Sequence, residues 1–553
     1  MAIPIETGPM AAPQQEAYCS RVIHHLGLVS GMIDELGLVE RIDALIPKKE
    51  QQIVSYGQAV KAMILNGLGF TQRVLYLTPH FFRDKPVEHL IGEGITAAQL
   101  NDDLLGRTLD AIHAYGCNSF YSQLAVHSVQ KLGLLCQTGH LDSTSFHADG
   151  VYNSQLPPEE DSQLIHITQG YSRDHRPDLN QVVLQLLVER QAGIPLLMEA
   201  LSGNQADKTG FRQTLEQPMA QLRQDVGLRA IVADSALYTA ESLAQMNGYT
   251  WITRVPETLT LAKETIALTA PLFAAQPDEQ QHIELCTTYA DTRQRWLLIY
   301  SPAARQRALK TVNSAFAKQS QQELKAFEAL CRQEFACQAD AETAVQRFKK
   351  QLKLTTLADY QLIHEARYRR RGRPKPDQAA DYTIVRIEGA IASNVSVYRE
   401  RLQRKSCFIL ATNETDASRL PAEELLSTYK DQQKVERGFR FLKDPQFLAS
   451  TLFLKSVSRL MSLAAIMTLC LLVYAALEYR IRTTLAEADE TFPNQSGRPI
   501  ANPTARWVFQ YFMGIHILTI HGTQTVLLNM NGPHRKLLKL LGDCYVKYYS
   551  DSG

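Results

Sequence analysis

The chain has 553 residues, too many for one ordinary hydrophobic core, so its length predicts two to four domains. Its 58 lysines and arginines are balanced by 57 aspartates and glutamates, and a formal net charge of +1 excludes binding of nucleic acid through overall basicity. Any surface that binds nucleic acid must therefore be a local one.

Nine cysteines are scattered along the chain without a CxxC pair. This argues against a zinc ribbon and suits a reducing compartment. The first residues, "MAIPIETGPMAAPQQ", lack the charged and apolar regions of a signal peptide. We therefore expect a cytoplasmic protein.

After a tail over residues 1–19, residues 20–135 show apolar residues at three- and four-residue spacing, which predicts helices. Glycines and prolines divide this region into short pieces. The pattern predicts a small all-α domain.

The pattern changes over residues 136–257. Three or four short strands are expected between residues 140 and 200, followed by a helix, the strand "LRAIVADS", a second helix and the strand "TWITRVP". This order predicts an α/β domain with a mixed sheet.

Two aspartates lie in these strands. Asp234 is the last residue of an apolar strand, where it either caps a following helix or belongs to a functional site. Asp142 lies in the first strand, next to serines and with no helix to cap. Burying a carboxylate is costly unless a partner satisfies its charge.

Residues 258–415 read as an insertion. A strand pair is followed by residues 303–371, which contain no glycine or proline and predict a helical hairpin, before strands resume. The run "YRRRGRPKP", starting at Tyr368, holds an Arg-Gly-Arg-Pro core similar to an AT-hook that enters a narrow minor groove. A solvated basic loop explains it equally well.

Helices are expected over residues 416–485 and again over residues 486–553. Residues 461–477 carry no charge over 17 positions, at the lower limit for a membrane span. Because this stretch is isolated and interrupted by Ser462 and Thr468, we expect a helix buried in the core, and no membrane partner.

The run "YKDQQKVERGFRFLKDP" contains a lone glutamate, Glu436, among cations. On one continuous helix Tyr429, Gln432, Glu436 and Lys443 would share a face. A surface ion pair between Glu436 and Arg440 is one interpretation. Cations at Lys434, Arg437, Arg440 and Lys443 form a slowly turning stripe, which suits either phosphate binding or solvation.

Asp142, Asp234 and Glu436 together are the carboxylates that could hold two Mg²⁺ ions, with Mn²⁺ as a substitute. Such a pair of ions activates water or a 3′-hydroxyl for attack on a phosphodiester. The absence of a His/Cys cluster argues against zinc.

The spacing Y-x2-Q-x3-E-x6-K resembles the Y-x2-R-x3-E-x6-K signature of DDE transposases of bacterial insertion sequences, with three of its four positions matched. "LDSTSFH" and "IVADSALYTAESL" resemble the family's two aspartate strands. The N-terminal "LGLVSGMIDELGLVERIDALIP" is similar to the helical domain of the insertion-sequence-1634 type, within the insertion sequence 4 superfamily.

The resemblance implies an RNase H-like α/β catalytic core, split by the insertion ahead of the glutamate helix. It implies that Asp142, Asp234 and Glu436 form the catalytic, metal-binding triad. The residues that it implies contact DNA, or that could do so, are Tyr429, Gln432, Lys443, Arg440, Arg254, Phe408, Arg371 and Arg373.

Several of these roles have an alternative. Gln432 stands where the family has arginine, so one phosphate contact is weakened. Arg254 could be an ordinary edge-strand arginine. Phe408 could stack on a flipped base or simply be core.

The sequence therefore predicts a transposase that binds the terminal inverted repeats of its element, cleaves DNA and joins it to a target, acting on double-stranded DNA as a dimer or larger assembly in the nucleoid. The N-terminal helical domain is the candidate for end recognition. A nuclease or resolvase of the same fold and an inactive DNA-binding remnant are the alternatives.

Overall fold

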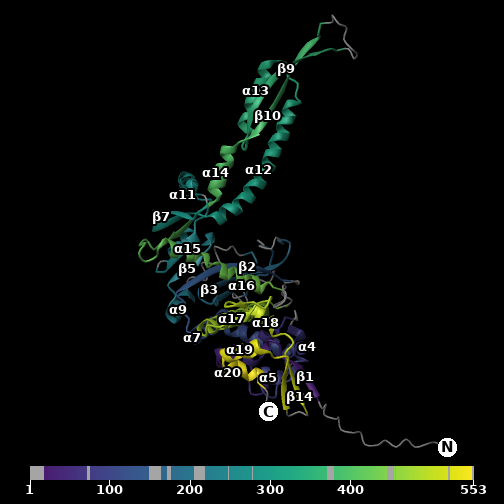
Figure 1. The fold of residues 1–553 in the computed structure, drawn as a ribbon, viewed down its shortest axis with the longest axis vertical. Coiled ribbons are helices and arrows are strands. Elements are labelled where there is room, and N and C mark those ends of the chain that lie inside the picture. The colour runs from purple at the N-terminus through teal and green to yellow at the C-terminus, as the bar shows by residue number, and fades with distance from the viewer. Residues whose placement is uncertain are drawn as a thin grey trace, which may run out of the picture. The chain divides into compact units, whose positions relative to one another are not determined.

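The computed structural model describes residues 18–70, 75–148, 164–170, 176–204, 218–246, 248–276, 278–369, 379–444, 454, 456–520 and 524–550. The chain divides into two compact units, which are described separately. Unit 1 comprises Met1–Thr253 and Asp416–Gly553, and unit 2 comprises Arg254–Thr415. Figure 1 gives the element labels.

Unit 1 begins with the expected helical region, preceded by one short strand, β1 (Tyr18–Val22). The α-helices are α1 (Leu26–Leu36), α2 (Leu38–Leu45), α3 (Tyr56–Gly67), α4 (Thr78–Phe82), α5 (Val87–Leu90), α6 (Asp102–Tyr115) and α7 (Cys117–Lys131). Short 3-10 turns are η1 (Leu75–Leu77) and η2 (Ala97–Gln99). Ser55 and Gln58 form a capping box that starts α3, and the asparagine Asn101 caps α6.

A mixed sheet follows. Its strands in unit 1 are β2 (Thr138–His147), β3 (Gln181–Glu189), β4 (Pro195–Ser202), β5 (Ala230–Ala233) and β6 (Thr250–Arg254). They lie in the order β4-β3-β2-β5-β6, with β2, β5 and β6 parallel and β3 and β4 antiparallel to their neighbours. The α/β core with a mixed sheet is thus present. Between β2 and β3, the described residues 164–170 contain no strand and only one isolated bridge, between Thr168 and Gln181.

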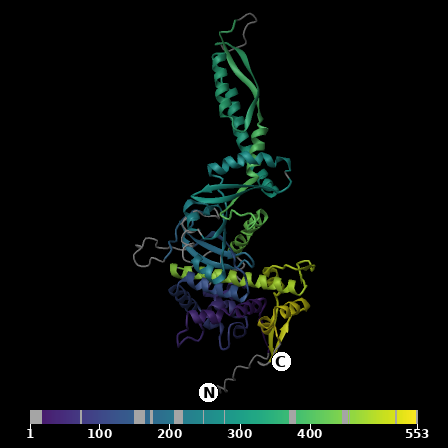
Figure 2. The same ribbon diagram turned by 90° about the vertical axis from the view of Figure 1, so that its left-hand side faces the viewer.

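Short helices connect these strands: α9 (Pro218–Val226), the 3-10 turn η3 (Ser235–Leu237) and α10 (Ala240–Gln245). The long helix α17 (Val457–Glu487) is the center of unit 1, since it packs against α1, α3, α6 and α7 on the one hand and β4 on the other. In Figure 2 it is the long yellow-green helix between the blue strands and the purple N-terminal helices. Among the described helices, α17 alone is long and apolar enough to cross a membrane, and 83% of its most apolar window is buried in the protein.

The C-terminal region differs from the helical expectation. Besides α18 (Ala505–Tyr511), α19 (Gly532–Leu541), α20 (Asp543–Val546) and the 3-10 turn η5 (Lys547–Tyr549), it contains the strands β12 (Phe492–Pro493), β13 (Pro499–Ile500), β14 (His516–Ile520) and β15 (Gln524–Leu528). β14 pairs with both β15 and the N-terminal β1. The two isoleucines and the threonine of "HILTI" favour a strand, and the unforeseen N-terminal strand supplies its second partner.

Unit 2 contains α11 (Thr260–Thr269), the 3-10 turn η4 (Ala270–Ala275) and the hairpin β7 (Gln281–Tyr289) and β8 (Thr292–Tyr300), to which β11 (Cys407–Thr412) adds. An arm follows β8: α12 (Pro302–Cys331), α13 (Gln338–Gln351), β9 (Thr355–Arg367), β10 (Tyr382–Ser393) and α14 (Val395–Lys405). The arm has its own apolar core, which includes Phe327, Val345 and Ile387.

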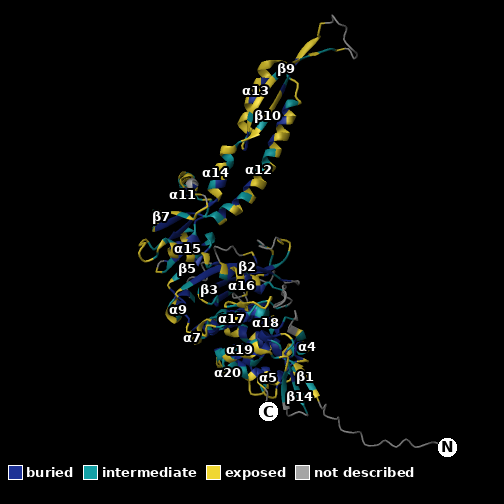
Figure 3. Ribbon diagram, in the orientation of Figure 1, coloured by how far each residue is buried: buried dark blue, intermediate teal, exposed yellow. Residues whose placement is uncertain are grey.

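The expected helical hairpin is therefore only partly correct, because its second half ends near Gln351 and becomes strand β9. β9 pairs with β10 along its whole length. Its start is rich in threonine, and a long partner strand is available, so non-local pairing overrides local helix propensity. In Figure 3, the hairpin of β9 and β10 and the helices of the arm are coloured largely as exposed or intermediate.

Candidate functional site

The two aspartates lie on neighbouring parallel strands in unit 1, Asp142 inside β2 and Asp234 directly after β5. The pairing of β2 with β5 runs to Leu141 opposite Ala233, so Asp142 and Asp234 come next on the two strands. Adjacent strands are about 4.8 Å apart, and residues in register point to the same face. The sheet thus brings the two aspartates side by side at the point where β5 ends.

Each aspartate is oriented by a backbone N–H. Asp142 is buried, and its Oδ1 accepts a hydrogen bond from the Ser143 amide at 2.8 Å. Asp234 is half-buried, and its Oδ1 accepts from the Ala236 amide at 2.8 Å, which caps the turn η3. Capping, the alternative that the sequence left open for Asp234, is therefore real. It also holds the carboxylate in a defined orientation.

The Asp234 backbone is held from the next strand as well. The Thr253 hydroxyl donates to the Asp234 carbonyl at 2.7 Å. Since β5 and β6 are parallel, this bond secures the strand end where Asp234 lies.

The helix that carries Glu436 is not continuous from Tyr429, as the sequence had suggested. Tyr429 lies in α15 (Ala422–Lys430), and Glu436 lies in the first turn of α16 (Gln433–Leu442). Between them the backbone tightens, with the Gln432 amide bonded to the Tyr429 carbonyl at 3.1 Å. A single helical wheel therefore does not apply across this junction.

Contacts with β3 explain the junction. Asp431 forms an ion pair with Arg190, which follows β3, at 2.7 Å. The Lys434 ammonium donates to the Arg190 carbonyl. These contacts fix the chain on both sides of the turn. They also engage Lys434, a half-buried member of the predicted cation stripe, with the backbone after β3.

α16 packs on β2 and β3 through a buried face that includes Val435, Phe439 and Leu442. Glu436 lies in the first turn, where the helix dipole favours a carboxylate, and its side chain is exposed. Within the described part of the chain, Glu436 and Arg440 form no ion pair, so the surface-pair interpretation loses its main support.

Gln432 joins α16 directly to the aspartate strand. Its Nε2 donates to the Leu141 carbonyl at 3.0 Å, and the His140 Nδ1 donates to its Oε1 at 3.1 Å. Both partners come immediately before Asp142. Gln432 is only 8% exposed. The structure therefore places its amide inside the protein, against β2.

Sequence reasoning missed His140. It is fully buried, and burial lowers its pKa to about 4, so the ring is neutral near pH 7. A histidine two residues before Asp142 in the same strand was the available signal.

The remaining residues of the signature lie around this site. Tyr429 and Lys443 are half-buried, and Arg440 is exposed. The Lys443 ammonium lies 5.7 Å from the center of the Phe146 ring, on the same strand as Asp142. This contact places a cation near the end of β2.

Arg254 and Phe408 belong to unit 2, where they contact each other. The Arg254 guanidinium lies 5.6 Å from the center of the half-buried Phe408 ring and pairs with Glu257 at 2.8 Å. Burial opposes ionisation of Glu257, but the bonds and charges of Lys405 and Arg254 outweigh it and lower the pKa of the carboxyl. Arg371 and Arg373, with most of the AT-hook-like run, lie outside the described residues.

The side chains where the pairing of β2 with β5 ends suit a hard divalent cation, because Asp142 and Asp234 both offer carboxylate oxygens there. The third ligand is not gathered with them: in the described residues no group of three or more His, Cys, Asp or Glu side chains is close enough to hold a metal ion. Asp142 and Asp234 therefore fit a metal site, and Glu436 lies on the helix bound to the same strand but is not assembled with them.

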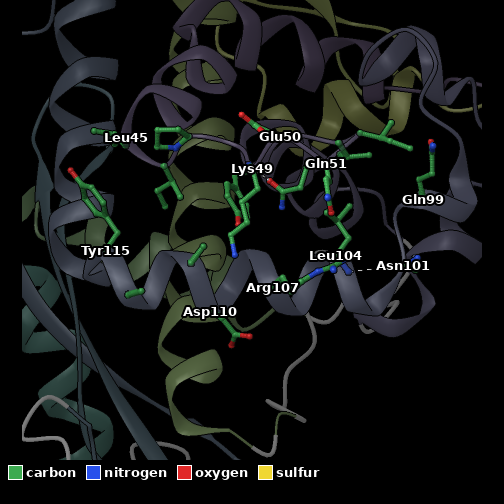
Figure 4. Close-up of a pocket in the computed structure, with 18 residues that line it drawn as sticks. Leu45, Lys49, Glu50, Gln51, Gln99, Asn101, Leu104, Arg107, Asp110 and Tyr115 are labelled. Carbon is green, nitrogen blue, oxygen red and sulfur yellow. Dashed lines mark hydrogen bonds between the residues drawn. The ribbon is translucent and has the colours of Figure 1, made fainter.

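A second feature lies in the N-terminal helical region. A groove of about 1250 Å³ separates the segment after α2 from α6 and is lined by Lys49, Glu50, Arg107, Asp110 and Tyr115, among others. Figure 4 shows Arg107 and Asp110 on α6, with Lys49 and Glu50 on the opposite wall. The lining mixes charges of both signs, and Asp110 is paired with Arg459 of α17 at 2.7 Å.

Comparison with known proteins gives two family matches. Residues 138–473 match the transposase DDE domain, and residues 18–126 match a domain of unknown function, DUF4277. The first match includes Asp142, Asp234 and Glu436. No curated protein matches the chain.

One solved structure is similar over most of the chain. The synaptic complex of the piggyBac transposase with hairpin DNA covers 88% of this chain and 78% of its own, with 8% sequence identity and a TM-score of 0.34. At that TM-score the likeness supports no argument about the fold or the site.

Proposed function

Because the chain belongs to the transposase DDE domain family, which matches residues 138–473, we propose that it is the transposase of an insertion sequence, with an RNase H-like core. It binds the terminal inverted repeats of its element, cleaves their strands and joins them to target DNA. The observation that carries this proposal is that Asp142 and Asp234 follow directly on the last paired residues of β2 and β5, Leu141 and Ala233.

In this proposal Asp142 and Asp234 hold a divalent metal ion where β5 ends, and Glu436 of α16 is the third carboxylate ligand. Bound Mg²⁺ would supply Lewis-acid activation of the attacking oxygen and stabilisation of the leaving one. The chain itself orients the carboxylates through the Ser143 and Ala236 amides. In the proposal Lys443, whose ammonium lies over the Phe146 ring on the Asp142 strand, contacts a DNA phosphate.

The YREK-type grouping is part of the proposal, with Gln432 as its exception. Synapsis of two element ends implies at least a dimer on DNA. The groove beside α6 is the candidate surface for end recognition.

The test is strand cleavage and joining on DNA that carries the sequences flanking the gene. With Mg²⁺, we expect the wild-type protein to release cut ends and form joined products. Asp142→Asn and Asp234→Asn should each lower the cleavage rate by at least about 10²-fold, because one metal ligand is lost.

The matched control is Asp225→Asn, an exposed aspartate on α9, which should cleave normally. Equal cleavage by wild type and Asp142→Asn would refute the triad. Cleavage without joining would favour a nuclease or resolvase of the same fold. DNA binding without cleavage would favour the inactive DNA-binding remnant.

A further inference from the structure

The arm of unit 2 carries a helix with two different faces. α12 turns Val312, Phe327 and Leu330 inward, toward the arm's own elements. Its opposite face carries Arg307, Lys310, Lys318 and Lys325, which we call the α12 stripe. At about 100° per residue these four positions fall within roughly 80° of one another.

All four side chains of the α12 stripe are exposed. The first and last are 18 positions apart in the sequence, which is about 27 Å along the helix axis, or roughly eight base pairs of duplex DNA. Between them, Ser314 and Gln321 are exposed on the same face. The face thus combines long cations with short hydrogen-bond donors.

Acidic residues are arranged so that they do not neutralise the stripe. Of the two in α12, Glu323 is buried and bound to the backbone N–H groups of Lys353 and Thr355. Glu328 pairs with Arg332 at the end of the helix. Among the described residues, the four stripe cations therefore have no carboxylate partner.

The neighbouring helix α14 also carries arginines. α14 packs on α12 through Tyr398, whose ring meets Phe316 at 5.3 Å and whose hydroxyl donates to Asn313 at 2.6 Å. α14 adds Arg399 and Arg401. Unit 2 as a whole holds 25 lysines and arginines against 18 aspartates and glutamates, a net charge of +7 in a chain of net charge +1.

We propose that the α12 stripe binds the phosphate backbone of duplex DNA without reading its sequence. This inference rests on the proposed function, since it names a second DNA contact, one that belongs to unit 2. Cations spaced along one rigid helix suit a line of phosphates. A lipid surface would require an apolar face beside the cations, but the apolar face of α12 is turned into the arm's core.

The test compares two full-length variants that lose the same charge from the same arm. The stripe variant is Arg307→Gln, Lys310→Gln, Lys318→Gln and Lys325→Gln. The control is Arg347→Gln, Lys349→Gln, Lys350→Gln and Lys353→Gln, whose side chains are also exposed. Binding to a duplex of arbitrary sequence is measured by fluorescence anisotropy at several salt concentrations.

Each phosphate contact contributes about 0.9 to the slope of log K against log salt concentration. We expect the stripe variant, which loses four contacts, to reduce the slope by about 3.6 and to weaken binding at least about tenfold, while the control stays near wild type. Equal slopes for the two variants would refute the proposal, because general charge would then explain the binding.

Two further measurements separate the possible failures. If the wild-type protein does not bind duplex DNA, the proposed function itself fails. If the stripe variant binds DNA normally but loses binding to phosphatidylserine vesicles, the partner is a membrane and the DNA proposal is wrong. Unchanged melting temperatures show that both variants fold.

Discussion

At the start of α16, Gln432 uses both ends of its amide inside the protein, on Leu141 and His140. The resemblance to YREK transposases implies a DNA phosphate contact at this position. The observed hydrogen bonds instead suit a residue that positions the Glu436 helix against the Asp142 strand. These two roles have different consequences when Gln432 is replaced.

We predict that Gln432→Ala lowers the free energy of unfolding by about 1–3 kcal/mol, because buried polar groups lose their partner. The cleavage rate should fall, since α16 loses its link to β2. Affinity for duplex DNA should stay unchanged. Thermal denaturation, cleavage kinetics and a DNA titration measure the three quantities.

Gln433→Ala is the matched control, because this neighbouring glutamine is exposed. It should leave stability and cleavage unchanged. Weaker DNA binding by Gln432→Ala, with an unchanged melting temperature, would instead support the phosphate contact.

At the scale of elements, one carboxylate joins α12 to the start of β9. Glu323 accepts from the Lys353 amide at 3.0 Å, and from the Thr355 amide and hydroxyl at 2.9 and 2.6 Å. Burial opposes ionisation, but these hydrogen bonds outweigh it and lower the pKa of Glu323 below its ordinary 4.5. The contact fixes the point where the chain leaves α13 and becomes a strand.

The pH dependence follows from the direction of that shift. A lowered pKa stabilises the fold fully above the unfolded-state pKa near 4.5, and the stabilisation is lost as the pH falls through the folded-state pKa. Glu323→Gln should therefore destabilise the arm at pH 7 by about 1.5–3 kcal/mol, the worth of charge-assisted hydrogen bonds. It should also flatten the loss of stability in acid.

Hydrogen exchange of the amides of residues 353–355, followed by mass spectrometry between pH 7 and pH 4, measures this effect. Glu328→Gln on the same helix serves as the control, because its pair with Arg332 is exposed. Equal protection in both variants would contradict a structural role for Glu323.

At the scale of the whole molecule, the first and last described elements of unit 1 pack together. β1 pairs with β14, and α20 packs on α1. Tyr545 of α20 is fully buried, with its hydroxyl on Glu35, and Tyr549 donates to the His24 carbonyl at 2.6 Å. The C-terminal segment is therefore part of the N-terminal helical region.

Gly31 tests this junction. A Cβ at this position would lie 2.6 Å from the Tyr545 ring and 2.9 Å from the Cys544 carbonyl oxygen. We expect Gly31→Ala to cost about 1–3 kcal/mol in free energy of unfolding, the usual range for overpacking, and to make the C-terminal segment more sensitive to protease. Scanning calorimetry and limited proteolysis provide the readout.

Gly532→Ala is the comparison, because a Cβ there would have no neighbour within 4 Å. It should melt like wild type. A wild-type melting temperature for Gly31→Ala would show that α20 is not firmly docked on α1.

The sequence by itself determined the α/β order of the core, the strand positions of Asp142 and Asp234, and the apolar helix that became α17. These features follow from side-chain pattern within short windows, which is local information. The sequence also contains the motif around Glu436, but it does not reveal the break between α15 and α16.

Only the tertiary structure decided the features that depend on a distant partner. Gln432 is internal because β2 offers a histidine and a carbonyl about 290 positions earlier, and the helix tightens because Arg190 binds Asp431. β14 pairs with its neighbour β15 and gains β1, from the N-terminal region, as a second partner. Hydrogen bonds between segments far apart in sequence leave no periodicity in either segment, so local pattern cannot reveal them.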